Sequence, residues 1–157
     1  MVQLDRTEKE IIRSLQKDGR MSFVDMAERV GVTEGTIRRK FYRLVEEGVL
    51  QIGAITDPFM VGFKTPAVIG LNVDTDRIGE VVKALAAVPR IRQLMLTTGI
   101  FDIILVGYFS SNRELARFIT DELSRIEGIT DTNTSVVLEI YKDSFEVGLP
   151  ANTGDDE

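Results

Sequence analysis

Four basic side chains lie close together in the first third of the chain, and their chemistry is easy to interpret. Arg38, Arg39 and Lys40 are consecutive, Arg43 follows three residues later, and no acidic residue lies between them. Arginine forks bind the O6 and N7 atoms of guanine in the DNA major groove, and lysine or tyrosine side chains bind phosphates. The cluster therefore indicates contact with nucleic acid, although a charged surface that only faces solvent would have the same composition.

Other kinds of chemistry are excluded by residues that the chain lacks. Its 157 residues include no cysteine and no histidine. Disulfides, zinc ribbons, iron–sulfur clusters and thiol nucleophiles need cysteine, and imidazole bases and the usual metal sites need histidine. The sequence also has no paired-carboxylate motif and no phosphate-binding glycine loop. We therefore predict that the protein is not an enzyme and binds no metal or cofactor.

The charge is distributed unevenly along the chain. The net charge is −6, but residues 1–50 contain ten basic and nine acidic side chains and so carry +1, which leaves −7 on the rest. Such asymmetry favours nucleic acid as a partner of the N-terminal part. The N-terminus is polar and no apolar run approaches about 18 residues, so we expect a soluble, cytoplasmic protein without a membrane partner.

The first fifty residues carry the signals of three short helices. Asp5 and Glu8 have the spacing of a capping box, and a second cap follows at Ser22. Gly31 is placed to end the second helix, and a third is expected over Thr33–Glu46. Two short helices joined around a glycine, the second of them basic, are typical of a helix-turn-helix.

The third helix has two different faces. At about 100° per residue, Ile37, Phe41, Leu44 and Val45 fall on one side, which should be buried. The other side and its flanks are polar and basic, as a helix in a major groove requires. The residues expected to contact DNA are Thr33, Gly35, Thr36, Arg38, Arg39, Lys40, Tyr42 and Arg43.

The remainder of the chain changes to a strand–helix–strand pattern that occurs twice. After a weakly alternating segment that suggests a linker strand, apolar strands are expected at 67–74, 91–98, 101–109 and 129–141, with helices at 78–88 and 112–126. This βαββαβ order predicts a ferredoxin-like sandwich, in which an antiparallel sheet has both helices on one face.

The strand over 101–109 is apolar on both sides. Ile103, Leu105 and Phe109 point one way, and Ile104, Val106 and Tyr108 point the other. A strand of this kind needs cover on both faces, and two helices cover only one. We therefore predict that a second subunit covers the other face. A twofold homodimer also suits a helix-turn-helix, whose two copies would bind symmetric half-sites.

These motifs, in this order, resemble the Lrp/AsnC family of feast/famine regulators in bacteria and archaea. The resemblance extends from about residue 3 to 142, and it implies a helix-turn-helix domain joined by a strand to a small-molecule-sensing domain through which members dimerise and often form octameric rings. The segments that carry it are Leu4-Asp5, Leu15-Gln16-Lys17-Asp18-Gly19-Arg20, Ala27-x-x-Val30-Gly31-Val32-Thr33, Arg43-Leu44-x-x-x-Gly48-Val49-Leu50, Gly99-x-Phe101-Asp102 and Thr132-x-Thr134.

The expected fold class is therefore α+β. We predict an N-terminal (winged) helix-turn-helix domain over 1–50 and a linker strand over 51–65. A ferredoxin-like domain for ligand sensing and oligomerisation should follow over 66–142, and a C-terminal tail over 143–157.

The resemblance also implies an effector site, built from the loop after the second strand and from the last strand. A glycine lets backbone approach a ligand, threonine hydroxyls can bind a carboxylate, and Asp102 can pair with an ammonium group. The alternative is a simple glycine turn whose aspartate is satisfied within the protein. The residues implied are Thr97, Thr98, Gly99, Ile100, Phe101, Asp102, Thr132 and Thr134.

Two departures from the family pattern limit what can be transferred. Ile100 stands where many relatives have a polar residue, and the third helix has no proline in its first turn. The predicted function is a sequence-specific, DNA-binding transcriptional regulator whose assembly or DNA binding responds to a small molecule, with an amino acid favoured. The alternative is an architectural protein that wraps DNA without a ligand. Some proteins that resemble this family are sirohaem decarboxylases, whose chemistry relies on histidines, and this activity is disfavoured because the chain has no histidine.

Overall fold

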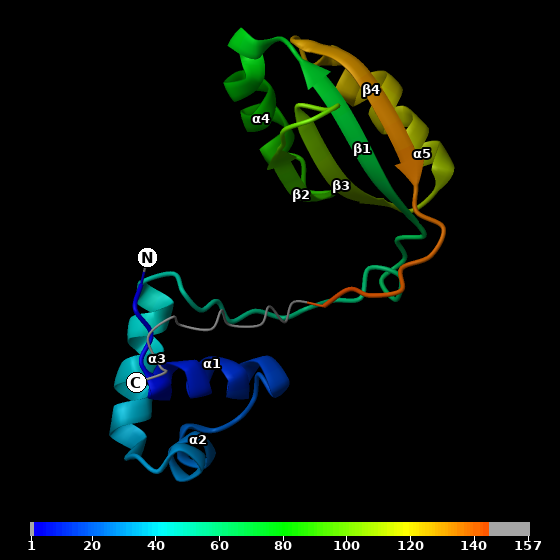
Figure 1. The fold of residues 1–157 in the computed structure, drawn as a ribbon. Coiled ribbons are helices and arrows are strands. Elements are labelled where there is room, and N and C mark those ends of the chain that lie inside the picture. Colours follow the sequence, from blue (N-terminus) through cyan, green and yellow to red (C-terminus); the bar gives the residue numbers. More distant parts are fainter. Residues whose placement is uncertain (1, 145–157) are drawn as a thin grey trace. The chain divides into compact units, whose positions relative to one another are not determined.

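The computed structural model describes residues 2–144 and divides into two compact units (Figure 1). One unit is built on the residues up to Ala54, and the other spans Ile55–Tyr141. The division falls inside the linker expected over 51–65. Most of the expected tail, residues 145–157, lies outside the described residues.

The first unit consists of the helices α1 (Arg6–Lys17), α2 (Phe23–Val30) and α3 (Glu34–Glu46). All three begin at N-caps whose side chains accept a backbone N–H three residues later, as the cap residues predict. Gly31 ends α2 with a positive φ of 78°, a conformation that glycine adopts without strain. The helices enclose one core, formed by Ile11, Ile12, Met26, Ala27, Ile37 and Leu44.

One residue of the expected buried face of α3 is placed differently. Val45 is 38% exposed, whereas Ile37 and Leu44 are fully buried. Val45 lies about 80° around the helix from Ile37, at the edge of the apolar arc.

The linker strand expected over 51–65 is not formed. Residues 50–57 have no regular secondary structure, a turn occupies 58–62, and the first strand begins only at Thr65. A strand needs a hydrogen-bonded neighbour, and no strand of the described chain pairs with this segment. For the same reason no β-hairpin wing follows α3 within residues 47–64.

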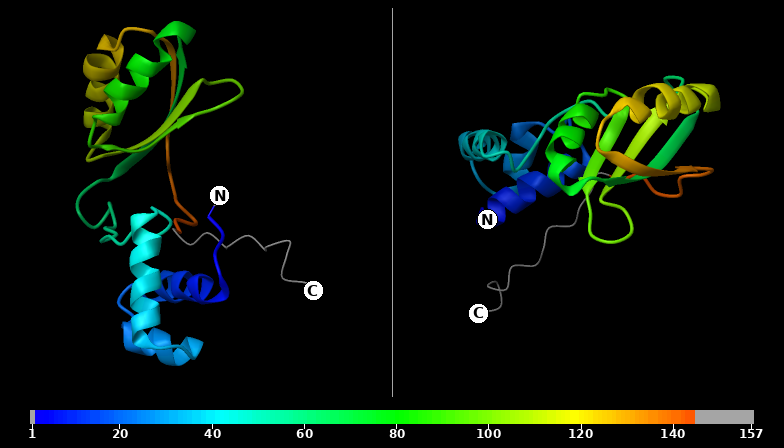
Figure 2. Two further views of the ribbon diagram at one scale, coloured as in Figure 1. Left: turned by 90° about the vertical axis from the view of Figure 1, so that its left-hand side faces the viewer. Right: turned by 90° about the horizontal axis from the view of Figure 1, so that it is seen from above.

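The second unit is a four-stranded antiparallel sheet with two helical segments. Its strands are β1 (Thr65–Val73), β2 (Ile91–Leu96), β3 (Ile103–Phe109) and β4 (Ile129–Val136), in the spatial order β2-β3-β1-β4. A 3₁₀ turn over Thr75–Arg77 leads into α4 (Ile78–Ala86), and α5 begins at Asn112. Both helices lie on one face of the sheet (Figure 2), as the βαββαβ pattern predicts.

Two elements of this unit differ from expectation. The helix expected over 112–126 is α-helical only to Arg117 and continues as a π-helix over Phe118–Glu122 and a 3₁₀ turn over Leu123–Arg125. Phe118 and Leu123 are both fully buried. Five residues of regular α-helix would turn them about 140° apart, and the wider π turn brings both to the core. The last strand ends at Val136, opposite Ala67, rather than at Tyr141. The next residue of β1, Pro66, accepts the Val137 N–H at 2.8 Å but has no N–H of its own to continue the ladder.

The two faces of the sheet differ in their cover. Ile103, Leu105 and Phe109 are fully buried under the helices, as predicted. On the other side, Ile104 and Val106 are partly exposed, and their register partners Gly70 and Val68 share that side. We call this side the open face, since no helix of the described chain covers it. No helix among residues 2–144 is long and apolar enough to cross a membrane.

Candidate nucleic-acid interface and ligand loop

The N-terminal turn of α3 presents small and polar groups outward. The Thr33 hydroxyl accepts the N–H of Thr36 at 3.3 Å and lies 2.9 Å from the Thr36 hydroxyl. A side chain added at Gly35 would meet only open space, so a partner can approach the backbone closely here. Arg39 is exposed on the same side of the helix and has no ion pair among the described residues. These residues form the outward face of α3: Thr33, Gly35, Thr36 and Arg39.

Arg38 is exposed but held in place on the side of α3 that faces α2. Its guanidinium group lies 2.5 Å from the Glu34 carboxylate and 5.0 Å above the ring of Phe23. The hydrogen bond to Glu34 raises the pKa of Arg38. Tyr42, which is half exposed, packs edge-on against Phe23 and Phe41. Arg38 is therefore oriented by an anion and an aromatic ring before any ligand arrives.

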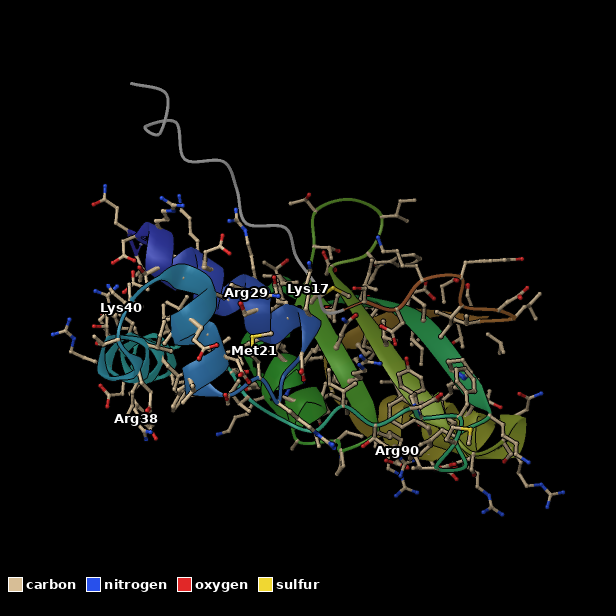
Figure 3. The ribbon with its side chains drawn as sticks, turned by 90° about the horizontal axis from the view of Figure 1, so that it is seen from below. Lys17, Met21, Arg29, Arg38, Lys40 and Arg90 are labelled. Carbon is tan, nitrogen blue, oxygen red and sulfur yellow. The ribbon has the colours of Figure 1, made fainter. Side chains whose placement is uncertain are left out.

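Lys40 points in a different direction, toward α1 (Figure 3). Its ammonium group is hydrogen-bonded to the carboxylate of Asp5 and lies 3.4 Å from the carboxylate of Glu8. Only 19% of the Lys40 side chain is exposed, and the hydrogen bond to Asp5 raises the pKa of Lys40.

Arg43 is engaged with the same buried carboxylate. Its terminal nitrogen lies 2.6 Å from Glu8 Oε1, and its Nε lies 3.7 Å from Glu47 Oε1. Glu8 is only 1% exposed. The four basic residues that the sequence places together thus divide into one outward cation, Arg39, and three that have carboxylate partners within the domain.

The loop between β2 and β3 contains the first part of the expected effector site, and the side chains of Thr97 and Asp102 in it are hydrogen-bonded within the protein. The Asp102 carboxylate accepts the N–H of Val73 at 2.9 Å, and the Asp102 N–H donates to Leu71 at 3.0 Å. The Thr97 hydroxyl donates to the Phe101 carbonyl at 2.6 Å. Gly99 has a φ of 130°, so the turn requires a glycine at this position. Ile100, at the tip, is 85% exposed.

Phe101 lies flat over a glycine of the open face. A Cβ atom added to Gly70 would come within 2.5 Å of the Phe101 ring, so only glycine leaves room for this ring. The second part of the expected site lies on the other side of the sheet. Thr132 and Thr134 pair in register with Leu71 and Ile69, whose side chains are buried under the helices. The structure therefore does not bring Phe101 together with these two threonines within one chain.

Comparison with known proteins gives the family. Residues 66–147 match the model described as the Lrp/AsnC ligand binding domain, and residues 4–51 match one described as a winged helix-turn-helix DNA-binding domain. The chain belongs to the Lrp/AsnC family. An HTH-type transcriptional regulator of Pyrococcus abyssi is 36% identical over 142 residues, which cover 90% of both chains. The HTH-type transcriptional regulator FL11 of Pyrococcus furiosus is 32% identical over 145 residues, covering 92% of this chain and 95% of that protein.

Solved structures agree with this fold. The L-Met complex of a transcriptional regulator from Neisseria meningitidis has a TM-score of 0.86 at 25% identity, covering 93% of this chain and 97% of that one. AsnC of E. coli superposes with a TM-score of 0.84 at 19% identity, covering 90% and 97%. As a member of the Lrp/AsnC family, the chain is a DNA-binding transcriptional regulator with a ligand-binding domain. It is not an enzyme, which agrees with the expectation from the sequence.

Sequence reasoning missed three groups that this Lrp/AsnC chain places at the two sites. Asp5 and Glu8 were identified only as a helix cap, and nothing in their spacing indicates the ion pairs they make with α3, some 32 to 35 residues away. Asn133 pairs in register with Gly70 and so lies on the open face, beside the ring of Phe101. Strand alternation from Gly70 outward would have identified Asn133, had the register of β4 been known.

Proposed function

We propose that this protein is a sequence-specific regulator that binds the DNA major groove through the outward face of α3. The observation that carries the proposal is the contrast on this helix: its N-terminal turn offers Gly35, two hydroxyls and the unpaired Arg39, while its opposite side fills the core. Arg39 suits bidentate contact with guanine, and the hydroxyl of Thr36 suits a base edge or a phosphate. Arg38 and Tyr42 flank this face and suit phosphate contacts.

The test is the substitution Arg39→Ala, compared with Arg13→Ala as a matched control. Arg13 is an exposed arginine of α1 that pairs with Glu10, so it loses the same charge outside α3. Genomic fragments selected by the wild type supply the specific DNA, and fluorescence anisotropy measures the dissociation constant. We expect Arg39→Ala to weaken specific binding roughly 5- to 150-fold, which corresponds to about 1–3 kcal/mol for a bidentate base contact. Equal affinities for the two variants would refute the assignment of α3.

We further propose a homodimer that covers the open face of the sheet, with larger assemblies up to an octamer built from it. Half-buried Val68, Ile104 and Val106 together with Met95 make this face apolar, and an apolar sheet face is stabilised by a second layer. A dimer would also supply two copies of α3 for a symmetric operator. Light scattering on the full chain tests this proposal: a monomer at micromolar concentration would contradict it.

The effector proposed for the ligand-binding domain is an amino acid with an apolar side chain. Support comes from Ile100 at the exposed tip of the ligand loop and from the similar Neisseria meningitidis regulator, whose structure is an L-Met complex. Because Phe101 and the threonines Thr132 and Thr134 lie on opposite faces of one sheet, a site using both would need a second copy. Thermal shift assays with the twenty amino acids test this, and an unchanged melting temperature with all of them would contradict it.

One observation favours a second candidate, a protein that wraps DNA without an effector. Two of the polar side chains expected to bind a ligand are already hydrogen-bonded within the chain: Thr97 to the Phe101 carbonyl in the loop, and Asp102 to the Val73 N–H of β1. Selection of genomic fragments with and without added amino acids separates the two functions, because only an effector-dependent regulator changes its bound fragments. In both cases DNA is the partner, and a cytoplasmic location stays a prediction.

A further inference from the structure

Glu8, at the start of α1, is a buried carboxylate whose partners are the basic residues of α3. Its Oε2 accepts the backbone N–H of Asp5 at 3.0 Å, and its Oε1 lies 2.6 Å from Arg43 and 3.4 Å from Lys40. Asp5 supplies a second carboxylate to Lys40. These two acidic groups make ion pairs with Lys40 and Arg43 of the kind that a cation free of protein partners can make with a DNA phosphate.

The burial of Glu8 decides which of these contacts can be exchanged. A surface ion pair is screened by water and is weak, so a DNA phosphate can replace it readily. A buried carboxylate that loses its cation is left unpaired in a poorly solvated site, which is strongly unfavourable. Moving both Arg43 and Lys40 to phosphates would leave Glu8 in that state, and moving one of them would leave it with a single cation.

We propose that Glu8, together with Asp5, determines the DNA specificity of this protein by withholding Lys40 and Arg43 from phosphates. The inference rests on the proposed function, in which α3 binds DNA. Phosphate contacts strengthen binding to all sequences alike, whereas contacts to base edges distinguish them. With these two cations paired to carboxylates of the domain, the outward face of α3 contributes a larger share of the total binding energy, and binding is more selective.

The experiment replaces the two acids by their amides, Asp5→Asn with Glu8→Gln. Asparagine is a good N-cap and glutamine completes a capping box, so α1 keeps its start. Lys40 loses both of its charged partners, and Arg43 loses Glu8 and keeps only the longer contact with the exposed Glu47. The matched control is Glu10→Gln with Glu28→Gln, which changes the net charge equally at positions away from Lys40 and Arg43. Binding to a selected fragment and to a scrambled fragment is measured across a range of KCl concentrations.

The expected result is steeper salt dependence and lower selectivity. Each new phosphate contact adds about 0.9 to the slope of log affinity against log salt, so two released cations add up to about 1.8 and strengthen scrambled-DNA binding up to about eightfold per contact in 0.1 M salt. The control pair should leave the slope unchanged. If the amide pair behaves like the control, or weakens binding to both fragments at constant slope, the proposal is overturned.

A second variant protects the test against misfolding. Lys40→Met keeps the apolar stem of the side chain, and if Lys40 is withheld from DNA in the wild type, the slope stays constant. A decrease of about 0.9 would place Lys40 on a phosphate and overturn the proposal. Arg39→Ala distinguishes a failure of the proposed α3 interface from a failure of the proposed role of Glu8. Unchanged specific binding in Arg39→Ala refutes the α3 interface itself. Weakened binding in Arg39→Ala, together with an unchanged salt dependence in the Asp5→Asn, Glu8→Gln variant, refutes only the role of Glu8.

Discussion

Gly70 is the position at which a single methyl group should disturb the ligand-binding domain most. It lies in the middle of the central strand β1, and the ring of Phe101 covers it on the open face. A Cβ at residue 70 would be 2.5 Å from two ring atoms, where ordinary contact begins at 3.4 Å, so in Gly70→Ala the ring has to move by about 1 Å. Phe101 cannot move alone, because its carbonyl accepts the Thr97 hydroxyl and Asp102 beside it is hydrogen-bonded to β1.

The cost should be that of an overpacked site, about 1–3 kcal/mol. For a unit of this size each kcal/mol lowers the melting temperature by roughly 4–8 °C, which calorimetry on the full chain resolves easily. Gly79→Ala in α4 is the matched control, since nothing lies within 4 Å of a Cβ there and alanine favours the helix. That control should be neutral or slightly stabilising.

A double-mutant cycle with Phe101→Ala tests the cause. Once the ring is absent, Gly70→Ala should cost almost nothing, so the two substitutions should show a coupling of 1 kcal/mol or more, typical of residues in direct contact at roughly 0.5–3 kcal/mol. An equal cost of Gly70→Ala in both backgrounds would show that backbone effects, and not the ring, account for the glycine.

Three further predictions concern the same domain. Asp102→Ala removes the acceptor for the Val73 N–H and should lower the free energy of unfolding by about 1–3 kcal/mol, whereas Asp102→Asn keeps an acceptor and should cost less. If an effector ammonium pairs with the Asp102 carboxylate, Asp102→Asn also loses the ligand-induced shift in melting temperature. A shift of full size in the folded variant would argue against that pairing. Hydrogen bonds from the Ser110 hydroxyl and from the Ser110 backbone N–H lower the pKa of Glu114 from its usual 4.5, so the carboxylate adds stability above pH 4.5 that is lost as the pH falls. In urea unfolding at neutral and acid pH, the stability of Glu114→Gln should therefore decrease less on acidification than that of the wild type. Identical pH profiles for the two proteins would contradict this. Ile104→Glu places a charge on the open face and should convert a dimer to a monomer in light scattering while circular dichroism stays native; a dimer of unchanged mass would remove the open face from the interface.

What could be predicted from the sequence is mainly what depends on local spacing. The three helix starts were predicted because each cap residue bonds a backbone N–H only three residues away. The βαββαβ order followed from periodicity, and the fully buried side of β3 from simple alternation. These features depend on a few neighbouring residues, so they can be identified before the fold is known.

What could not be predicted depends on register and on contacts between distant segments. Thr132 and Thr134 were assigned to the effector site, but which face they occupy depends on the pairing of β4 with β1, and a shift of one residue would reverse it. The π-helix after Arg117 satisfies the packing of Phe118 and Leu123, which no helical periodicity indicates. The pairing of Lys40 and Arg43 with the first turn of α1 likewise exists only once the two helices are packed.

The pairing of Lys40 and Arg43 with the first turn of α1 lowers the number of cations that the DNA-binding domain can offer to DNA. The sequence shows ten basic and nine acidic residues in its first fifty, and the structure shows that three of the four cations on α3 are paired with carboxylates. Only the exposed Arg38–Glu34 pair among these is readily exchanged for a phosphate, so one copy of α3 offers limited nonspecific attraction of the kind that strengthens most DNA binding. Tight binding would have to come from base contacts made twice, once by each copy in a dimer, because linking two weak sites multiplies their affinity. The nearly balanced charge of residues 1–50, which carry +1, and the proposed dimeric state thus have one physical explanation: a single copy of α3 with so few free cations binds DNA weakly, and two together can bind it selectively.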